Sequence, residues 1–102
     1  MNTQQLESFL AVAENLSFAR AAEDLNITQS AVSRQIHALE NELDTRLFHR
    51  TSRSVSLTPA GISFYEDAKD FMGGLRIATE KIKRHSAFNM QILSIGFGND
   101  IE

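Results

Sequence analysis

Residues 17–37 read SFARAAEDLNITQSAVSRQIH and carry the most informative pattern of this 102-residue chain. Small and apolar residues over 18–25 predict a short helix, which Ser17 caps. Asn26 tolerates the left-handed backbone that a tight turn needs. Thr28 then caps a second helix, because apolar residues recur behind it at steps of three and four up to Leu43. Two helices joined by a tight turn predict a helix-turn-helix over about residues 18–37.

A further helix is predicted before this motif and a hairpin after it. Residues 3–14 place apolar side chains on one helical face, with Thr3 as the candidate cap. From Arg46 onward the pattern alternates, and the polar linker 51–53 separates two short runs, 47–50 and 54–57. These runs predict a two-stranded β-hairpin. The expected core contains Phe9, Leu10, Leu25, Val32, Ile36, Leu39, Leu47 and Phe48.

A long helix is predicted next, from Pro59 to about Ala87, with Thr58 as its cap. Gly73 and Gly74 interrupt its pattern, so we expect a bend or a close helix approach there. A heptad spacing predicts a dimer interface along it, formed by Tyr65, Ala68, Met72, Leu75, Thr79 and Ile82. Residues 90–98 are apolar enough to predict a buried strand, which would open a second domain over 89–102.

Composition and spacing exclude several classes of function. The chain has no cysteine, which removes disulfides, thiolate zinc sites and cysteine nucleophiles. Its three histidines lie on different predicted elements without metal-ligand spacing, and no glycine-rich phosphate loop is present. No apolar run is long enough to span a membrane, and no export signal is visible. The sequence therefore predicts a cytoplasmic protein with no catalytic residues, no metal and no cofactor in this fragment.

The outer face of the second helix of the helix-turn-helix has the chemistry of a DNA-reading surface. The core positions face inward, which leaves a polar face without an acid before Glu40, formed by Gln29, Ser30, Ser33, Arg34 and His37. Gln pairs with adenine, Arg with guanine, and Ser with bases or phosphates. The alternative is an ordinary solvated helix face.

The charge distribution matters more than the total charge. The net charge of −3 argues mildly against a nucleic-acid partner. Residues 46–58, however, contain three arginines and no acid, and most acids lie elsewhere. A basic hairpin after a recognition helix is typical of a wing that contacts phosphates or the minor groove. Arg50 and Arg53 are the candidate contacts, although Arg50 could instead form an ion pair with a helix acid.

The order of these motifs resembles the N-terminal domain of LysR-type transcriptional regulators. The resemblance covers residues 1 to about 87 and is carried by residues 18–23, 28–36 with Leu39 and Glu40, 47–50 with Arg53, and 57–61. It implies a mainly α fold: a winged helix-turn-helix over 1–58, with its wing at about 46–58, and a dimerising linker helix over 59–88. It also implies bacterial gene regulation in response to a small-molecule inducer.

The resemblance assigns roles to individual residues. Gln29, Ser33 and Arg34 match the family's recognition-helix contacts, and Arg50 and Arg53 match its basic wing positions. Ser30 stands where the family very often has proline, and His37 where a more basic residue is common. Residues 90–98 resemble the first strand of the family's effector-binding domain. The inducer is therefore expected on that domain, almost all of which is missing here.

These observations lead to one principal interpretation. The chain is expected to bind double-stranded DNA sequence-specifically at an interrupted palindromic promoter site, as a homodimer that could form a tetramer in the full-length protein. One alternative is a winged-helix module that binds protein, and another is the accessory domain of a truncated enzyme. A steep loss of DNA affinity with salt would separate the first interpretation from the protein-binding module, because only DNA binding releases condensed counterions.

Overall fold

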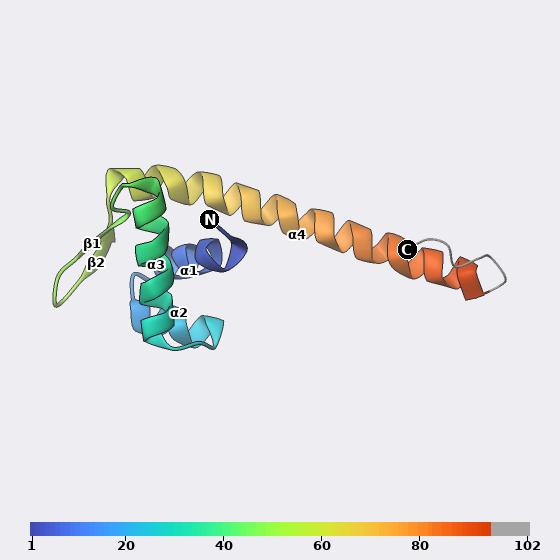
Figure 1. Cartoon of the computed structure of the whole chain (residues 1–102), viewed down its shortest axis with the longest axis horizontal. Coiled ribbons are helices and arrows are strands. Elements are labelled where there is room, and N and C mark those ends of the chain that lie inside the picture. Colours follow the sequence, from blue (N-terminus) through green and yellow to red (C-terminus); the bar gives the residue numbers. More distant parts are fainter. Residues whose placement is uncertain (95–102) are drawn as a thin grey trace. The chain divides into compact units, whose positions relative to one another are not determined.

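The fold is mainly helical, and its elements follow one another in the predicted order. The computed structural model describes the backbone of residues 1–94 and the side chains of residues 1–86. Three helices, α1 (Thr3–Asn15), α2 (Phe18–Leu25) and α3 (Gln29–Leu43), precede the strands β1 (Phe48–Arg50) and β2 (Val55–Leu57) (Figure 1). The last element is helix α4 (Pro59–Ser94). The chain divides into two units, residues 1–72 and residues from 73 onward.

Side chains cap the helices at their first turns. The Ser17 and Thr28 side chains accept hydrogen bonds from the Arg20 and Ala31 N–H groups, as predicted. Helix α1 differs from the prediction, because Asn2 rather than Thr3 is its cap. The Asn2 side chain accepts from the Gln5 N–H, and the Gln5 side chain accepts from the Asn2 N–H. This reciprocal pair satisfies two N–H groups, whereas a cap at Thr3 would not form it.

Three consecutive helices end in the left-handed backbone region without a glycine. Leu16, Asn26 and Asp44 have φ values of 50°, 60° and 53°. The prediction for Asn26 is thus confirmed. Each of these residues reverses the chain direction in a single step, and its N–H bonds back to a carbonyl of the preceding helix. The connections between the three helices are consequently very short.

Helices α1, α2 and α3 pack together around the predicted core. The Phe9 ring lies 5.4 Å from that of Phe48 and 5.1 Å from that of Phe64, between ring centroids. The fully buried side chains of the core include Phe9, Val12, Val32, Ile36, Leu39, Leu47 and Phe48, and Leu10 and Leu25 are half-buried against them. The core therefore joins α1 and α3 to the wing.

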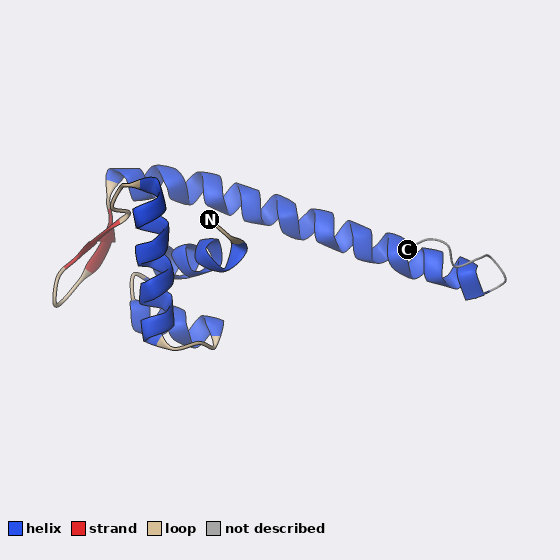
Figure 2. Cartoon of the chain, viewed as in Figure 1, coloured by secondary structure: helices blue, strands red, loops and turns tan. Residues whose placement is uncertain are grey.

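The wing is an antiparallel hairpin whose tight turn is built by one threonine. Phe48 pairs with Leu57, and Arg50 pairs with Val55 (Figure 2). The Thr51 side chain accepts from the N–H groups of Arg53 and Ser54, at 3.2 and 3.0 Å. These bonds hold Arg53 in the turn.

The first turn of α4 is fastened to the strand segment by Thr58. This buried side chain accepts from the Gly61 N–H at 3.0 Å and donates to the Arg46 carbonyl at 2.7 Å. Gly61 lies so close to that segment that a Cβ atom there would be 2.1 Å from the Leu47 carbonyl oxygen. Only glycine fits this approach without moving the backbone.

One expectation for the C-terminal part needs correction. Residues 90–94 form the last part of α4 rather than a strand, and residues 95–98 lie outside the described residues. A helix satisfies its N–H and C=O groups within its own segment, whereas a single strand lacks a pairing partner. Helix α4 also continues through Gly73 and Gly74, where an added Cβ would meet no atom of the described chain within 4 Å. No close approach surrounds these glycines within the described residues.

We predict that Gly61→Ala lowers the free energy of unfolding by about 3 kcal/mol, because the new methyl group would collide with a backbone carbonyl. Gly74→Ala is the matched control, since its methyl group has open space in this chain and alanine favours the helix by up to about 1 kcal/mol. Urea unfolding followed by circular dichroism measures both variants. Equal changes in the free energy of unfolding would show that no close approach of the backbone requires glycine at residue 61.

Candidate nucleic-acid interface

The first nine residues of α3 carry the polar side chains that the sequence singled out. Val32 and Ile36 are buried on the inner face of this helix, which turns the polar side chains outward. The five predicted residues line one shallow surface hollow: Gln29, Ser30, Ser33, Arg34 and His37. Ser33 is half-buried and the other four are exposed. Their predicted placement on one face is confirmed.

A second hollow connects this face to the wing. Its walls are the α1–α2 connection with the start of α2 (residues 16–19), the wing residues 50–55, and Gln29 and Ser33 of α3. Gln29 and Ser33 thus line both hollows. The outer face of α3 and the wing consequently form one continuous surface, which we call the α3–wing surface.

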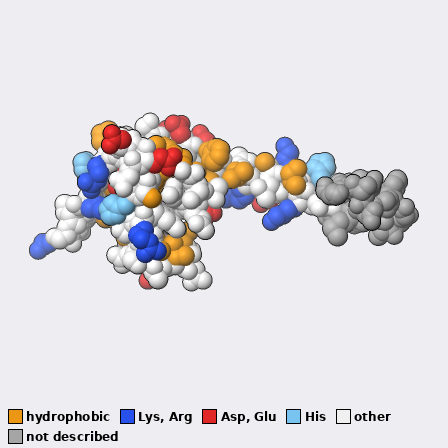
Figure 3. Space-filling model, in the orientation of Figure 1, with side chains coloured by type: hydrophobic (Ala, Val, Ile, Leu, Met, Phe, Trp, Pro, Cys, Tyr) orange, Lys and Arg blue, Asp and Glu red, His pale blue; other side chains and the backbone are white. Residues whose placement is uncertain are grey.

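The α3–wing surface is basic although the whole chain is acidic. Basic side chains gather over the wing and the adjoining side of α3, whereas acidic ones gather towards the start of α4 (Figure 3). Arg53 is exposed in the turn of the wing, and Arg34 is exposed on α3. No acid occurs between Arg46 and Thr58. A surface of this kind attracts polyanions.

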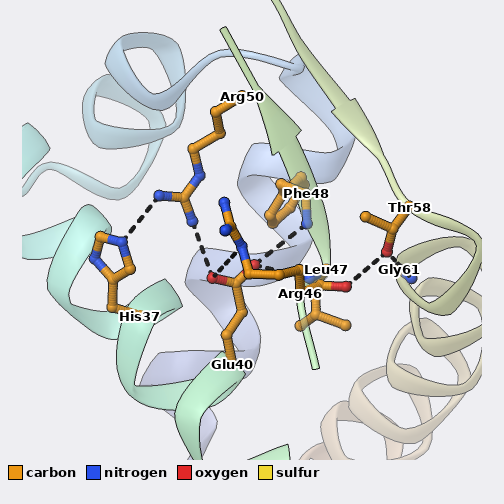
Figure 4. Close-up of polar contacts among 8 residues, drawn as sticks. All are labelled: His37, Glu40, Arg46, Leu47, Phe48, Arg50, Thr58 and Gly61. Carbon is orange, nitrogen blue, oxygen red and sulfur yellow. Dashed lines mark hydrogen bonds and ion pairs between the residues drawn. The ribbon is translucent and has the colours of Figure 1, made fainter. Parts of the chain in front are cut away.

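A buried carboxylate holds the wing against α3. Glu40 is only 5% exposed, and its Oε2 accepts from the N–H groups of Leu47 at 2.7 Å and Phe48 at 3.3 Å. Its Oε1 lies 3.2 Å from Arg50 Nη2 and 3.8 Å from Arg46 Nε (Figure 4). Four donors therefore converge on one side chain, which compensates for burying its charge.

Sequence reasoning did not assign Glu40 to the core and offered only an unnamed helix acid as a possible partner of Arg50. The signal was present in its spacing, because Glu40 lies four residues after Ile36 and eight after Val32. Residues at these steps share one face of a helix. Glu40 therefore belongs to the buried face of α3.

Arg50 is held by protein groups on several sides. Its Nη2 donates to Glu40, its Nη1 lies 3.1 Å from His37 Nε2, and its Cζ lies 4.8 Å from the centroid of the Phe18 ring. Its Nε is buried without a hydrogen-bond partner among the described residues. The alternative role of Arg50, an ion pair with a helix acid, is thus present. Contact of Arg50 with DNA stays a prediction.

The residues of the predicted dimer interface divide into two groups. Tyr65, Ala68 and Met72 pack against the core of their own unit, and Ala68 is 4% exposed. This gives the first half of the heptad pattern an intrachain role. Leu75, Thr79 and Ile82 are exposed in the second unit, where the Thr79 hydroxyl donates to the Leu75 carbonyl. Other large apolar side chains exposed on α4 are Ile62, Phe71 and Ile77.

Two further types of site were sought among the described residues. No group of three or more His, Asp or Glu side chains there is arranged to hold a metal ion. None of the described helices is both long enough and apolar enough to cross a membrane.

Comparison with known proteins places this geometry among characterised relatives. Residues 3–62 match the family model described as "Bacterial regulatory helix-turn-helix protein, lysR family". The HTH-type transcriptional regulator TfdS of Cupriavidus pinatubonensis is 41% identical over 97 residues, which are 95% of this chain and 33% of that protein. The glycine cleavage system transcriptional activator of Escherichia coli is 48% identical over 82 residues, 80% of this chain and 27% of that protein. The chain thus spans about a third or less of these relatives.

Solved structures agree with this result. The BenM DNA-binding domain, in a complex with catB site 1 DNA, superposes with a TM-score of 0.81 at 40% identity. The match covers 84% of this chain and 97% of that one. The CbnR DNA-binding domain, in a DNA complex, has a TM-score of 0.76 at 38% identity, over 85% of this chain and 99% of that one.

We predict that Glu40→Gln lowers the free energy of unfolding by about 2–4 kcal/mol, because the amide loses the charge that the arginines and N–H groups surround. Glu42→Gln is the control: Glu42 is exposed and pairs only with the N-terminal amine, so its loss costs less than about 1 kcal/mol. Urea titrations of both variants compare them directly. A loss at Glu40 no larger than that at Glu42 would contradict the role given to the buried carboxylate.

Proposed function

Because the chain belongs to the lysR family of bacterial regulatory helix-turn-helix proteins, we propose that it is a sequence-specific, DNA-binding transcriptional regulator. One observation carries the proposal: five polar side chains of α3 share one face that continues into a basic, acid-free wing. The proposal places α3 in the major groove and the wing on the minor groove or the phosphate backbone. The DNA complexes of the BenM and CbnR domains support it.

The chemistry of the exposed side chains supports different roles for α3 and the wing. The Gln29 amide has a donor and an acceptor that match the edge of adenine, and the Arg34 guanidinium has two donors that match the acceptors of guanine. The hydroxyls of Ser30 and Ser33 can bond to bases or phosphates. Arg53 lies in the wing turn without a salt bridge among the described residues, so it is available to phosphates or the minor groove.

The proposal includes a homodimer that forms through α4. Leu75 and Ile82 are 39% and 66% exposed, and their spacing of seven places them on one side of the helix. A second copy of α4 would remove these apolar surfaces from water. Two recognition helices related by dimer symmetry would read an interrupted, near-palindromic site.

The proposal assigns no catalytic or cofactor role to the described residues, since the relatives are transcriptional regulators. The bacterial chromosome as target implies a cytoplasmic location. Inducer binding is likewise assigned to none of the described residues.

We predict that Arg34→Ala weakens binding to a site selected from random duplex DNA by about 1–3 kcal/mol and relaxes the preference at one base pair. Arg53→Ala is predicted to weaken binding to the specific site and to random DNA to similar extents. It should also reduce the slope of the logarithm of the binding constant against the logarithm of the salt concentration by about 1. The reason is that Arg34 lies on the base-reading face and Arg53 in the wing turn. Fluorescence anisotropy titrations at several salt concentrations measure both.

The control for these two variants is Lys69→Ala. Lys69 lies over the Tyr65 ring on α4, away from the α3–wing surface, so its loss should leave the salt slope unchanged. Wild-type binding without a steep salt dependence would contradict the proposed function and favour a protein-binding module. If Arg34→Ala lowers the affinity for specific and random DNA equally, Arg34 is a phosphate contact.

We also predict that Leu75→Asp converts the dimer to monomers while residues 1–58 stay folded, because the seam would have to bury an unpaired carboxylate. DNA affinity should fall at least tenfold, since a monomer loses the effective concentration of two linked half-sites. Sedimentation and circular dichroism measure assembly and folding. Met72→Asp is a weaker test, because Met72 packs against its own core.

The matched control for Leu75→Asp is Ile77→Asp. Ile77 is 57% exposed and lies two residues further along α4, about 200° around the helix axis. It therefore lies off the predicted seam, and its substitution should leave the dimer intact. Equal dissociation by both variants, or a dimer that survives Leu75→Asp, would show that the interface lies elsewhere.

A further inference from the structure

A contact between α3 and the wing determines which nitrogen of His37 carries the proton. Arg50 Nη1 lies 3.1 Å from His37 Nε2. A guanidinium group has only donors and stays charged in proteins. His37 Nε2 must therefore accept in this hydrogen bond, which leaves the hydrogen of the neutral imidazole on Nδ1.

Arg50 cannot readily release this contact, because its guanidinium is held on its other sides. Its Nη2 pairs with the buried carboxylate of Glu40 at 3.2 Å, and its Cζ lies over the Phe18 ring. The Arg50 side chain is 21% exposed. The guanidinium group consequently lies between His37 and Glu40 (Figure 4).

The other nitrogen of His37 belongs to the α3–wing surface. His37 is exposed and lines the hollow formed with Gln29, Ser30, Ser33 and Arg34. Its Nδ1 has no hydrogen bond with any residue that the structure describes. In the neutral imidazole, the N–H group of His37 therefore faces this hollow.

We infer that His37 binds DNA as an uncharged hydrogen-bond donor through Nδ1–H, and that Arg50 is the positioning residue that sets this polarity. The inference rests on the proposed function. The acceptor is an oxygen or nitrogen of DNA, either on a base edge in the major groove or on a phosphate. Addition of a proton at Nε2 would turn two donors towards each other and break the contact with Arg50.

The first experiment reads the protonation of His37 in the DNA-free chain by nitrogen-15 NMR at neutral pH. We expect the Nδ1–H form at His37. His49 is the internal control, because it is exposed and its imidazole makes no hydrogen bond with the described residues, so it should show the Nε2–H form that predominates in water. Arg50→Lys should return His37 to that ordinary form, because lysine has no fork that spans both Glu40 and His37. A predominant Nε2–H form, or an imidazolium, in the wild-type chain would overturn the inference.

The second experiment measures DNA binding by His37→Ala and His37→Asn over a range of salt concentrations. We expect His37→Ala to lower affinity roughly three- to tenfold without changing the salt slope, since an uncharged donor releases no counterion. His37→Asn keeps an N–H group near the position of Nδ1 and should recover most of the loss. A slope reduced by about 1, as predicted for Arg53→Ala, would mean a charged imidazole and overturn the inference, as would an unchanged affinity.

The pattern of loss for His37→Ala identifies the acceptor. If the loss of affinity depends on the identity of one base pair, the acceptor is a base edge. If affinity falls equally on all DNA sequences, the acceptor is a phosphate. Failure of the wild-type chain to bind DNA would overturn the proposed function and the DNA contact together. The NMR result would still show whether Arg50 sets the tautomer, so the two failures are distinguishable.

Discussion

The Glu40 carboxylate accepts from two backbone N–H groups at the start of β1 and from Arg50 within β1. Through these bonds a side chain of α3 determines where the wing begins. The Leu47 carbonyl, in the same segment, accepts from the Thr58 N–H, and Thr58 caps the next helix. The recognition helix, the wing and the first turn of α4 are thus linked through consecutive hydrogen bonds. Because the carboxylate is buried, water competes weakly for these bonds.

The arginines of the hairpin itself, Arg50 and Arg53, have different surroundings. The wing contributes Arg53 at its exposed turn, but its second arginine points inward and supports the helix. Arg50 forms an ion pair with Glu40 through Nη2 and contacts His37 Nε2 through Nη1. Arg53 is therefore exposed to a ligand, whereas Arg50 also supports side chains of α3.

Periodicity predicted the helices, the wing and the core, because each of these elements buries a regular stripe of apolar side chains. The spacing of Val32 and Ile36 was enough to place five polar side chains on the opposite face of α3. The same pattern did not include Glu40, because it was built from apolar residues alone, although this acid is buried on the inner face of α3. Its burial depends on N–H groups seven and eight residues further along the chain, which no local pattern displays. The strand prediction was wrong for residues 90–94 for a related reason, since a strand requires a pairing partner whereas these residues form a helix.

The left-handed residues Leu16, Asn26 and Asp44 restrict how related sequences can differ in length. Each ends its helix in one step, and only Ser17 separates Leu16 from the first residue of α2. An inserted residue would rotate the following helix about its axis and turn its buried face towards water. Insertions and deletions should therefore be rare between residues 15 and 29, and change there should occur by substitution. The wing turn at residues 51–54 is exposed and makes only local hydrogen bonds. Length variation within this part of the fold should accordingly concentrate in that turn.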